Sequence, residues 1–363
     1  MRWLATMEAI GIIVEYNPFH NGHMHHLQQA KTQFPDATII AVMSGHFLQR
    51  GIPAILNKWQ RAELAIIHSI DIVIELPYAS SVQRADIFAR NAVQLLAAMN
   101  IKALVFGSES ADVETLTQLT SQPTEANDIL GYYYIQAIQA LGNKIQAMAI
   151  PRLESQYNQE TLGETTIASA TAIRQALNDG RTISNYVPAA TAKLLTSGNY
   201  PASEAYYNFI RHRILVNPDD LKDIALVAEG IENRLYDAAL EAQDYNAWLN
   251  LVATTRYRKN HLNRLATHIL TGTTWQQLDT AANNLDYLRV LGLSSRGQNY
   301  LRHNREHFPL PVITSLSRQT SLNAELELRA TTAYALLFQH HNITALLERE
   351  YNKKPILGGI IHD

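Results

Sequence analysis

The sequence predicts an α/β fold in two parts: a domain with a parallel β-sheet over residues 1–190, followed by an α-helical domain over residues 191–363. In the first part, short apolar runs alternate with stretches of helical periodicity, which is typical of strand–helix–strand units. From Pro201 onward, nearly all of the apolar spacing is helical. A cluster of turn residues between positions 178 and 188 separates the two patterns.

The first part contains five expected strands. The opening strand is the apolar run from Gly11 to Val14, which leads into a polar turn and a helix. Each later strand is a short, continuous apolar run, as expected for strands buried on both faces. These strands cover residues 37–43, 71–76, 103–106 and 144–150, and the expected helices cover residues 23–34, 60–68, 81–98, 112–122 and 127–141. Because the carboxyl ends of parallel strands share one edge of a sheet, we expect ligand-binding residues there.

Composition restricts the class of protein. The chain has 47% hydrophobic and 17% charged residues, which is ordinary for a globular protein. It has no cysteine, which excludes disulfides, thiol catalysis and cysteine-ligated zinc. No apolar run reaches the roughly 18 residues of a membrane span, so we expect a cytoplasmic protein with no membrane partner. We expect its structured part to begin near Met7.

The net charge of the chain is −3. This value argues against indiscriminate binding of nucleic acid, because such binding relies on a positive field around the whole molecule. Any contact with RNA must therefore come from a local basic patch.

The stretch GIIVEYNPFHNGHMHH, residues 11–26, carries the strongest functional signal. It predicts a strand, a tight loop and the start of a helix, where unpaired backbone N–H groups attract anions. Gly22 would let the backbone approach a phosphate closely, and His20 and His23 could donate hydrogen bonds to oxygens that gain charge during reaction at phosphorus. The alternatives are a pair of metal ligands or two surface histidines.

Two further stretches could contribute to the same site. In IASATAIR, residues 167–174, Ser169 and Thr171 can cap a helix while offering hydroxyl groups, and Arg174 can hold phosphates with two hydrogen bonds. Gly107 directly follows the fourth expected strand, where an adenosine or ribose could rest against the backbone. Gly107 could equally be a turn glycine.

Basic residues gather in two places. Arg50 and Lys58 follow the second expected strand, and we interpret them as contacts to phosphates, to RNA or to both. In the helical part, the segment RYRKNHLNR combines an aromatic ring with basic side chains, which suits a stacked base and an RNA backbone. Its expected RNA contacts are Arg256, Arg258, Lys259 and Arg264. For all six residues, the alternative is a solvated surface charge.

HNGH resembles the HxGH motif of the nucleotidyltransferase superfamily, whose members attack the α-phosphate of ATP and release pyrophosphate. IASATAIR resembles the ISSTxxR element of the same superfamily. The longer string EYNPFHNGH is more specific and is similar to the bacterial tRNA(Met) cytidine acetate ligase family. This resemblance covers nearly the whole chain. His46 and Ile52 depart from it, because the family usually has asparagine and glutamate at these positions.

The resemblance implies a Rossmann-like nucleotidyltransferase domain of the HUP class that uses ATP, Mg²⁺ and acetate. Acetate would attack the α-phosphate to form acetyl-adenylate, and N4 of the wobble cytidine of elongator tRNA(Met) would then take the acetyl group. Catalysis would fall to His20, His23 and Arg174, and no residue would bind a metal. The implied ATP-binding residues are Ile13, Val14, Glu15, Tyr16, Asn17, Pro18, Phe19, His20, Asn21, Gly22, His23, Met24, His25, His26, Gly107, Asn158, Ser169 and Arg174.

Two other functions would share these motifs. The first is a small-molecule adenylyltransferase that makes a coenzyme precursor, although such an enzyme has no evident need for a large helical domain. The second is a non-catalytic RNA-binding protein built on a nucleotidyltransferase fold. The sequence leaves the oligomeric state open.

Overall fold

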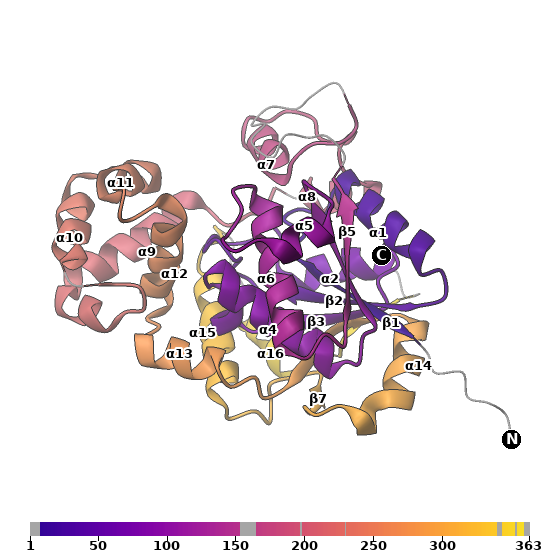
Figure 1. The fold of residues 1–363 in the computed structure, drawn as a ribbon. Coiled ribbons are helices and arrows are strands. Elements are labelled where there is room, and N and C mark those ends of the chain that lie inside the picture. The colour runs from indigo at the N-terminus through magenta and orange to yellow at the C-terminus, as the bar shows by residue number, and fades with distance from the viewer. Residues whose placement is uncertain are drawn as a thin grey trace, which may run out of the picture.

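The structure is a computed structural model, and it describes residues 8–152, 165–196, 198–228, 230–339, 343–352 and 354–358. Figure 1 shows a central sheet covered by helices, with a separate group of helices to its left. The expected start of the structured chain at Met7 and the expected nucleotide contact Asn158 lie outside the described residues. None of the described helices is long and apolar enough to cross a membrane.

Five parallel strands form the main part of the sheet, as the sequence predicts. They are β1 (Ala9–Val14), β2 (Thr38–Ser44), β3 (Ile72–Leu76), β4 (Ala103–Ser108) and β5 (Gln146–Pro151). β1 pairs with both β2 and β4, β2 pairs with β3, and β4 pairs with β5, so their order is β5-β4-β1-β2-β3. The carboxyl ends of all five strands therefore meet at one edge of the sheet, where ligands of such folds bind.

Helices cover both faces of this sheet. One face packs against α1 (Asn21–Gln33), α2 (Lys58–Ile67), α7 (Ala170–Asn178) and α8 (Ala189–Leu195). The other face packs against α4 (Ala85–Ala98), α6 (Ala126–Ala140) and the short α5 (Val113–Gln118), and α3 (Tyr78–Ser81) follows β3. In β2, Ile39 and Ala41 point into the first core, and Ile40 and Val42 point into the second. Burial on both faces explains the continuous apolar run of this strand.

The next segment forms a helical unit beside the sheet (Figure 1). It contains α9 (Ser203–Val216), the 3₁₀ helix η1 (Pro218–Asp223), α10 (Ile231–Glu241), α11 (Tyr245–Val252), α12 (Lys259–Thr271) and α13 (Trp275–Ala282). Tyr207, Trp248 and Leu262 lie in its core, together with Phe47 and Tyr78 from the sheet domain. The helical unit, defined as residues 203–282, therefore packs directly onto the sheet domain.

The prediction that helical structure extends to residue 363 is wrong, because the chain returns to the sheet after α13. β6 (Leu288–Leu293) pairs antiparallel with β3, and β7 (Val312–Ile313) and β8 (Ile356–Leu357) pair with β6. The connecting elements are α14 (Ser295–Asn304), η2 (Arg305–His307), α15 (Leu322–Ala335) and α16 (Ile343–Asn352). All of β6 is buried, and periodicity alone does not distinguish so short an apolar run from a buried helix.

A buried ion network fixes this C-terminal segment to the sheet. The Lys58 ammonium group lies 2.6 Å from Glu75 of β3, 2.9 Å from Glu327 of α15 and 2.7 Å from Glu350 of α16. Arg289 of β6 lies 2.9 Å from Glu75 and 2.5 Å from Glu350. None of the five side chains is more than 1% exposed.

The ion network contains three carboxyl groups and two cations. Burial and the neighbouring Glu75 carboxylate raise the pKa of Glu327 to about 8. This shift favours the protonated form of Glu327, in which two carboxylates face Lys58 and Arg289. This balance matters because an uncompensated charge in a dry interior is strongly unfavourable.

Candidate active site

A cavity of about 680 Å³ opens at the carboxyl ends of β1, β4 and β5, a volume that would accommodate a nucleotide. Residues of the first turns of α1 and α7 border it, and α12 with the loop before it approaches from the helical unit. Residues of the 11–26 motif that line the cavity are Ile13, Val14, Glu15, Tyr16, Asn17, His20, Gly22, His23, His25 and His26. The fold thus brings the predicted motifs together in one place.

His20 and His23 cap the start of α1 with their own side chains. Nδ1 of His20 accepts a hydrogen bond from the backbone N–H of Gly22 at 3.1 Å, and Nδ1 of His23 accepts one from the backbone N–H of His20 at 3.2 Å. The two rings stack with their centroids 3.7 Å apart. Burial, with the charges of Arg152 and Arg174, lowers the pKa of His20 to about 3, and burial also lowers the pKa of His23.

These hydrogen bonds fix where the ring protons lie. A neutral imidazole whose Nδ1 accepts a hydrogen bond carries its proton on Nε2, so both histidines are Nε2–H donors. A metal-ligating histidine instead donates through its other ring nitrogen, which contradicts the alternative of a metal pair. His20 is only 5% exposed, which also contradicts the surface alternative for that residue. Two neutral donors, side by side at a helix start, suit an anionic group.

Gly22 has a role in addition to the expected one, because it also makes room for the His20 ring. A Cβ atom at this position would lie 2.9 Å from Cε1 and 3.0 Å from Nδ1 of His20. These distances are too short for a side chain, so any other residue would displace the imidazole. Gly22 therefore keeps the His20 ring against the start of α1.

Arg174 joins the two motifs. Ser169 is the N-cap of α7, and its hydroxyl accepts a hydrogen bond from the backbone N–H of Ala172 at 3.0 Å, as the sequence predicts. Arg174 donates to the carbonyl oxygen of Asn17 at 2.7 Å and to the hydroxyl of Thr171 at 3.2 Å. Thr171 thus positions Arg174 from inside the helix, whereas a capping role was expected. The Arg174 guanidinium is held beside the loop that leads to the two histidines.

Two side chains, the half-buried Glu15 and the fully buried Arg61, shape the loops at the ends of β1 and β2. Glu15 accepts a hydrogen bond from the backbone N–H of Gln49 at 2.7 Å. Arg61 donates to the carbonyl oxygens of Glu15 at 2.7 Å and Ser44 at 3.0 Å, and also to that of Gly45. Burial raises the pKa of Glu15, and its hydrogen bond and nearby arginines oppose that rise. Sequence reasoning missed Arg61, because its position within a helix gives no sign that it is buried.

Gly107 lies within β4 and has no left-handed φ, so the alternative of a turn glycine is wrong. The nearest atom to a Cβ at this position would be Cγ of Arg152, at 3.5 Å. Arg152 directly follows β5 and lines the cavity, and its charge helps to lower the pKa of both His20 and His23. Sequence reasoning missed Arg152. The available signal was a basic residue directly after a parallel strand, at the edge where ligands bind.

The helical unit contributes basic side chains to the same cavity. Arg256, Arg258 and Arg264 line it, whereas Lys259 is exposed and is not among its lining residues. The ring of Tyr257 lies 5.3 Å from the Arg256 guanidinium. The basic segment predicted from sequence therefore faces the nucleotide motif.

The helical unit also holds the loop that carries Arg50, which lines the cavity. The carbonyl oxygen of Gly51 accepts hydrogen bonds from the hydroxyls of Thr267 in α12 at 2.7 Å and Tyr206 in α9 at 3.3 Å. Gly51 has a φ of +75°, and a Cβ there would lie 2.4 Å from Cα of Arg264. Only glycine allows this close approach of loop and helix.

The expected contact of Lys58 with phosphates or RNA is wrong, because Lys58 is fully buried in the ion network. Of the expected ATP-binding residues that the structure describes, four do not line the cavity: Pro18, Phe19, Asn21 and Met24. Asn21 instead donates to the carbonyl oxygens of Thr166 at 2.8 Å and Asn185 at 2.9 Å, and Phe19 stacks on His68. These two side chains hold the motif in place through contacts outside the cavity.

The cavity is strongly basic. Of the described residues that line it, Glu15 is the only acidic one, and seven are arginines: Arg50, Arg84, Arg152, Arg174, Arg256, Arg258 and Arg264. In a chain with a net charge of −3, this local excess indicates a polyanionic ligand. In the part of the chain that the structure describes, no group of three or more His, Cys, Asp or Glu side chains could hold a metal ion.

Comparison with known families gives the class of protein. Residues 7–125 and 120–349 match the family model described as HIGH Nucleotidyl Transferase. The matched residues include both the strand–loop–helix motif and the helical unit.

Comparison with individual proteins narrows the class. The chain is 37% identical to the tRNA(Met) cytidine acetate ligase of Geobacillus sp. (strain WCH70), over 97% of this chain and 100% of that protein. It is 34% identical to the ligase of the same name from Bacillus subtilis (strain 168), over 96% and 97%. Crystal structures of Thermotoga maritima TmcAL, apo and bound with alpha-thio ATP, match with TM-scores of 0.87 and 0.84 at 28% and 27% identity, and each covers 97% of this chain and 99% of the other. The chain belongs to the tRNA(Met) cytidine acetate ligase family.

Proposed function

We propose that this chain is a ligase that uses ATP to join acetate to N4 of the wobble cytidine of elongator tRNA(Met). The observation that carries this proposal is a single cavity lined both by the HNGH and IASATAIR residues and by arginines of the helical unit. ATP and RNA are both polyanions, and arginine suits the phosphates of both. The names of the curated relatives and the alpha-thio ATP bound to a structural relative support the same assignment.

In the first step, a carboxylate oxygen of acetate attacks the α-phosphorus of ATP, and the bond to the bridging oxygen of pyrophosphate breaks. The Nε2–H groups of His20 and His23 donate to the oxygens that gain charge at phosphorus. Arg174 and Arg152 hold the β- and γ-phosphates and stabilise the departing pyrophosphate. The product is acetyl-adenylate, and no proton is transferred.

In the second step, N4 of the cytidine attacks the acetyl carbon of acetyl-adenylate. The bond between that carbon and the AMP oxygen breaks, AMP leaves with its electron pair, and the amino group releases one proton. Arg256, Arg258 and Arg264 hold the RNA so that the cytidine reaches the cavity. The sequence of steps needs no covalent bond to the protein.

Mg²⁺ belongs to this proposal as the companion of ATP. The described lining of the cavity contains one carboxylate, Glu15, which accepts a hydrogen bond from Gln49, so the protein offers no cage of oxygen ligands. The ion would be held by phosphate oxygens and water, as is usual for Mg²⁺ with nucleotides. Its chemistry there is the neutralisation of phosphate charge.

The direct test incubates the protein with ATP, acetate and elongator tRNA(Met) and analyses the nucleosides by mass spectrometry. We expect N4-acetylcytidine together with one AMP per acetyl group. Absence of this product with folded protein and cognate tRNA would overturn the proposal. Release of pyrophosphate with a phosphorylated nucleotide or a pantetheine compound, but not with acetate, would instead favour the small-molecule adenylyltransferase.

The role of the histidines is tested with His20→Asn. Asparagine is a good N-cap, so this variant keeps the start of α1 but removes the Nε2–H donor. We expect acetate-dependent exchange between ATP and pyrophosphate to fall about 100- to 1000-fold. Lys31→Ala, on the last turn of the same helix, is the control and should exchange at the wild-type rate. If neither step occurs in the wild type and His20→Asn changes nothing, a non-catalytic RNA-binding protein is the better description.

A further inference from the structure

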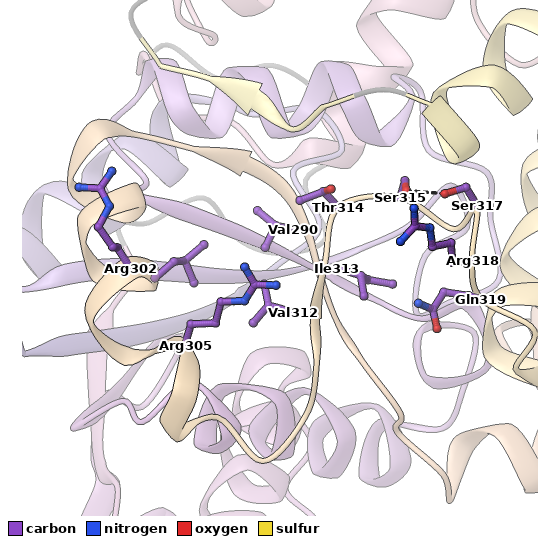
Figure 2. A pocket seen from close by; sticks show the side chains of 11 residues that line it. Val290, Arg302, Arg305, Val312, Ile313, Thr314, Ser315, Ser317, Arg318 and Gln319 are labelled. Atoms are coloured by element: carbon purple, nitrogen blue, oxygen red, sulfur yellow. Dashed lines mark hydrogen bonds between the residues drawn. The ribbon is translucent and has the colours of Figure 1, made fainter.

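A second hollow, of about 750 Å³, lies at the far edge of the sheet from β5, beside β6 and β7. Figure 2 shows Arg302 and Arg305 on one side of Val312, and Arg318 with Ser315 on the other. Arg302 comes from α14, Arg305 from η2 and Arg318 from the loop after β7. Among the described residues, none lines both this hollow and the cavity that contains the HNGH motif.

This arginine hollow is basic, and no acidic side chain among its described lining residues balances the positive charge. Among the described residues that line it, three are arginines and none is acidic. Arg302 donates a hydrogen bond to the amide oxygen of Asn299 at 3.2 Å, whereas Arg305 and Arg318 make no side-chain hydrogen bond or ion pair with a described residue. Three guanidinium groups around one hollow favour an anion that accepts hydrogen bonds from several sides.

The other lining groups suit a phosphate ester better than a simple inorganic anion. The hydroxyls of Ser315 and Ser317 lie 3.0 Å apart, so one donates to the other and one proton remains for a ligand. Val290, Val312 and Ile313 form an apolar floor between the arginines. Phosphate oxygens would meet the arginines and the hydroxyl, while a sugar or base would cover the floor.

We propose that the arginine hollow binds phosphate groups, and that its ligand is the backbone of the RNA substrate at a point away from the modified cytidine. The choice of RNA rests on the proposed function; the phosphate chemistry does not. All three arginines are exposed, so a polymer that passes over the surface can reach them. A large RNA would then contact the protein at two separate places, the hollow and the cavity.

The test compares two double variants that remove the same charge. Arg305→Ala with Arg318→Ala removes two cations from the hollow. Lys102→Ala with Lys144→Ala removes two exposed lysines that precede β4 and β5, outside both the hollow and the cavity. We expect the hollow variant to bind elongator tRNA(Met) about tenfold more weakly, with the slope of log affinity against log salt reduced by about two. The lysine variant should stay within about twofold of wild type, as should acetate-dependent exchange between ATP and pyrophosphate in both.

A third variant tests geometry against charge. Arg305→Lys with Arg318→Lys keeps both charges but loses the forked hydrogen bonds, so it should recover part of the affinity. Equal losses in the hollow and lysine variants would overturn the proposal, because they would show only an effect of net charge.

A second arm identifies the source of the phosphate by calorimetry with inorganic pyrophosphate. If tRNA affinity is unchanged but the hollow variant binds one pyrophosphate fewer than wild type, the phosphate site stands and its ligand is a free polyphosphate, which overturns the RNA assignment. Unchanged binding of both ligands overturns the whole proposal. If wild type makes no N4-acetylcytidine, the proposed function fails separately, and the pyrophosphate result still decides the phosphate site.

Discussion

The ion network and the cavity are both rich in charge, yet they differ in composition and exposure. In the network, Lys58 and Arg289 are fully buried and touch three carboxyl groups. In the cavity, the described lining residues include seven arginines and one carboxylate, Glu15, which border a space open to solvent. A buried charge needs an opposite charge within the protein, whereas an exposed charge can be balanced by a bound ligand. An excess of accessible charge of one sign is therefore the better mark of a binding site.

This difference also explains one failure of sequence interpretation. Lys58 and Arg50 look alike in the sequence, since both follow the second strand. Two of the partners of Lys58 lie far along the chain, at positions 327 and 350, and the third, Glu75, lies in the next strand, so the sequence around Lys58 gives no sign of them. Only the fold separates the structural cation from the cavity cation.

The largest expected effect breaks the network itself. Lys58→Met keeps much of the side-chain volume but leaves three carboxyl groups around a neutral group. We expect a loss of about 3–5 kcal/mol in the free energy of unfolding, because a buried charge loses its partner. Urea denaturation measures this loss. The matched control is Arg258→Ala at the exposed cavity rim, expected within about 0.5 kcal/mol of wild type. Similar losses in both variants would show that stability depends no more on the buried cation than on the exposed one.

A second prediction concerns the contact between the helical unit and the loop that carries Arg50. Gly51→Ala places a Cβ against the backbone of Arg264 and puts alanine at a φ of +75°. We expect about 1–3 kcal/mol of destabilisation and a weaker hold on the loop that carries Arg50. Thermal unfolding measures the first effect, and hydrogen exchange at residues 48–52 measures the second. Gly180→Ala is the control: it has a φ of +69° but no atom within 4 Å of the added Cβ. Equal effects in both would show that φ strain, not contact with the helical unit, is the cause.

The third prediction tests the cavity cations of the helical unit. Arg256→Ala with Arg258→Ala should weaken binding of elongator tRNA(Met) about tenfold and reduce the salt slope by about two. Affinity for ATP should stay unchanged, because neither residue belongs to the nucleotide motifs. Filter binding at several salt concentrations measures the affinities for tRNA and for ATP. If tRNA affinity is unaltered, the basic segment does not bind RNA.

The last prediction concerns the part of the pH dependence of stability that Glu327 contributes. The folded pKa of Glu327, about 8, lies above its ordinary value of 4.5, so the folded state holds this proton more tightly. The resulting stabilisation is present below about pH 4.5 and is lost as the pH rises to about 8, by at most about 1.4 kcal/mol per pH unit. Glu327→Gln cannot titrate and should flatten the stability curve between pH 6 and pH 8. Parallel curves for both proteins would show that Glu327 is ionised throughout.

The sequence predicts the parallel sheet and the histidine motif well, because both depend on local patterns. Five short apolar runs suffice to find β1 to β5, and the spacing of His20 and His23 marks the start of α1. The ring protons of these histidines were not predictable, since they depend on backbone N–H groups in the folded loop. β6 was missed because it pairs with β3, more than 200 residues earlier, and its short run lacks a strand signature of its own.

The return of β6, β7 and β8 to the sheet has a consequence for how the protein is made. While the ribosome is still synthesising the helical unit, Lys58 and Glu75 have emerged, but Glu327 and Glu350 have not. The sheet domain therefore cannot complete its interior until the last part of the chain leaves the ribosome. We expect a nascent chain stopped at residue 320 to be cut readily by protease within β3 and α2, and one that carries the whole sequence to be protected there. The order of synthesis therefore determines when the buried ion network can form.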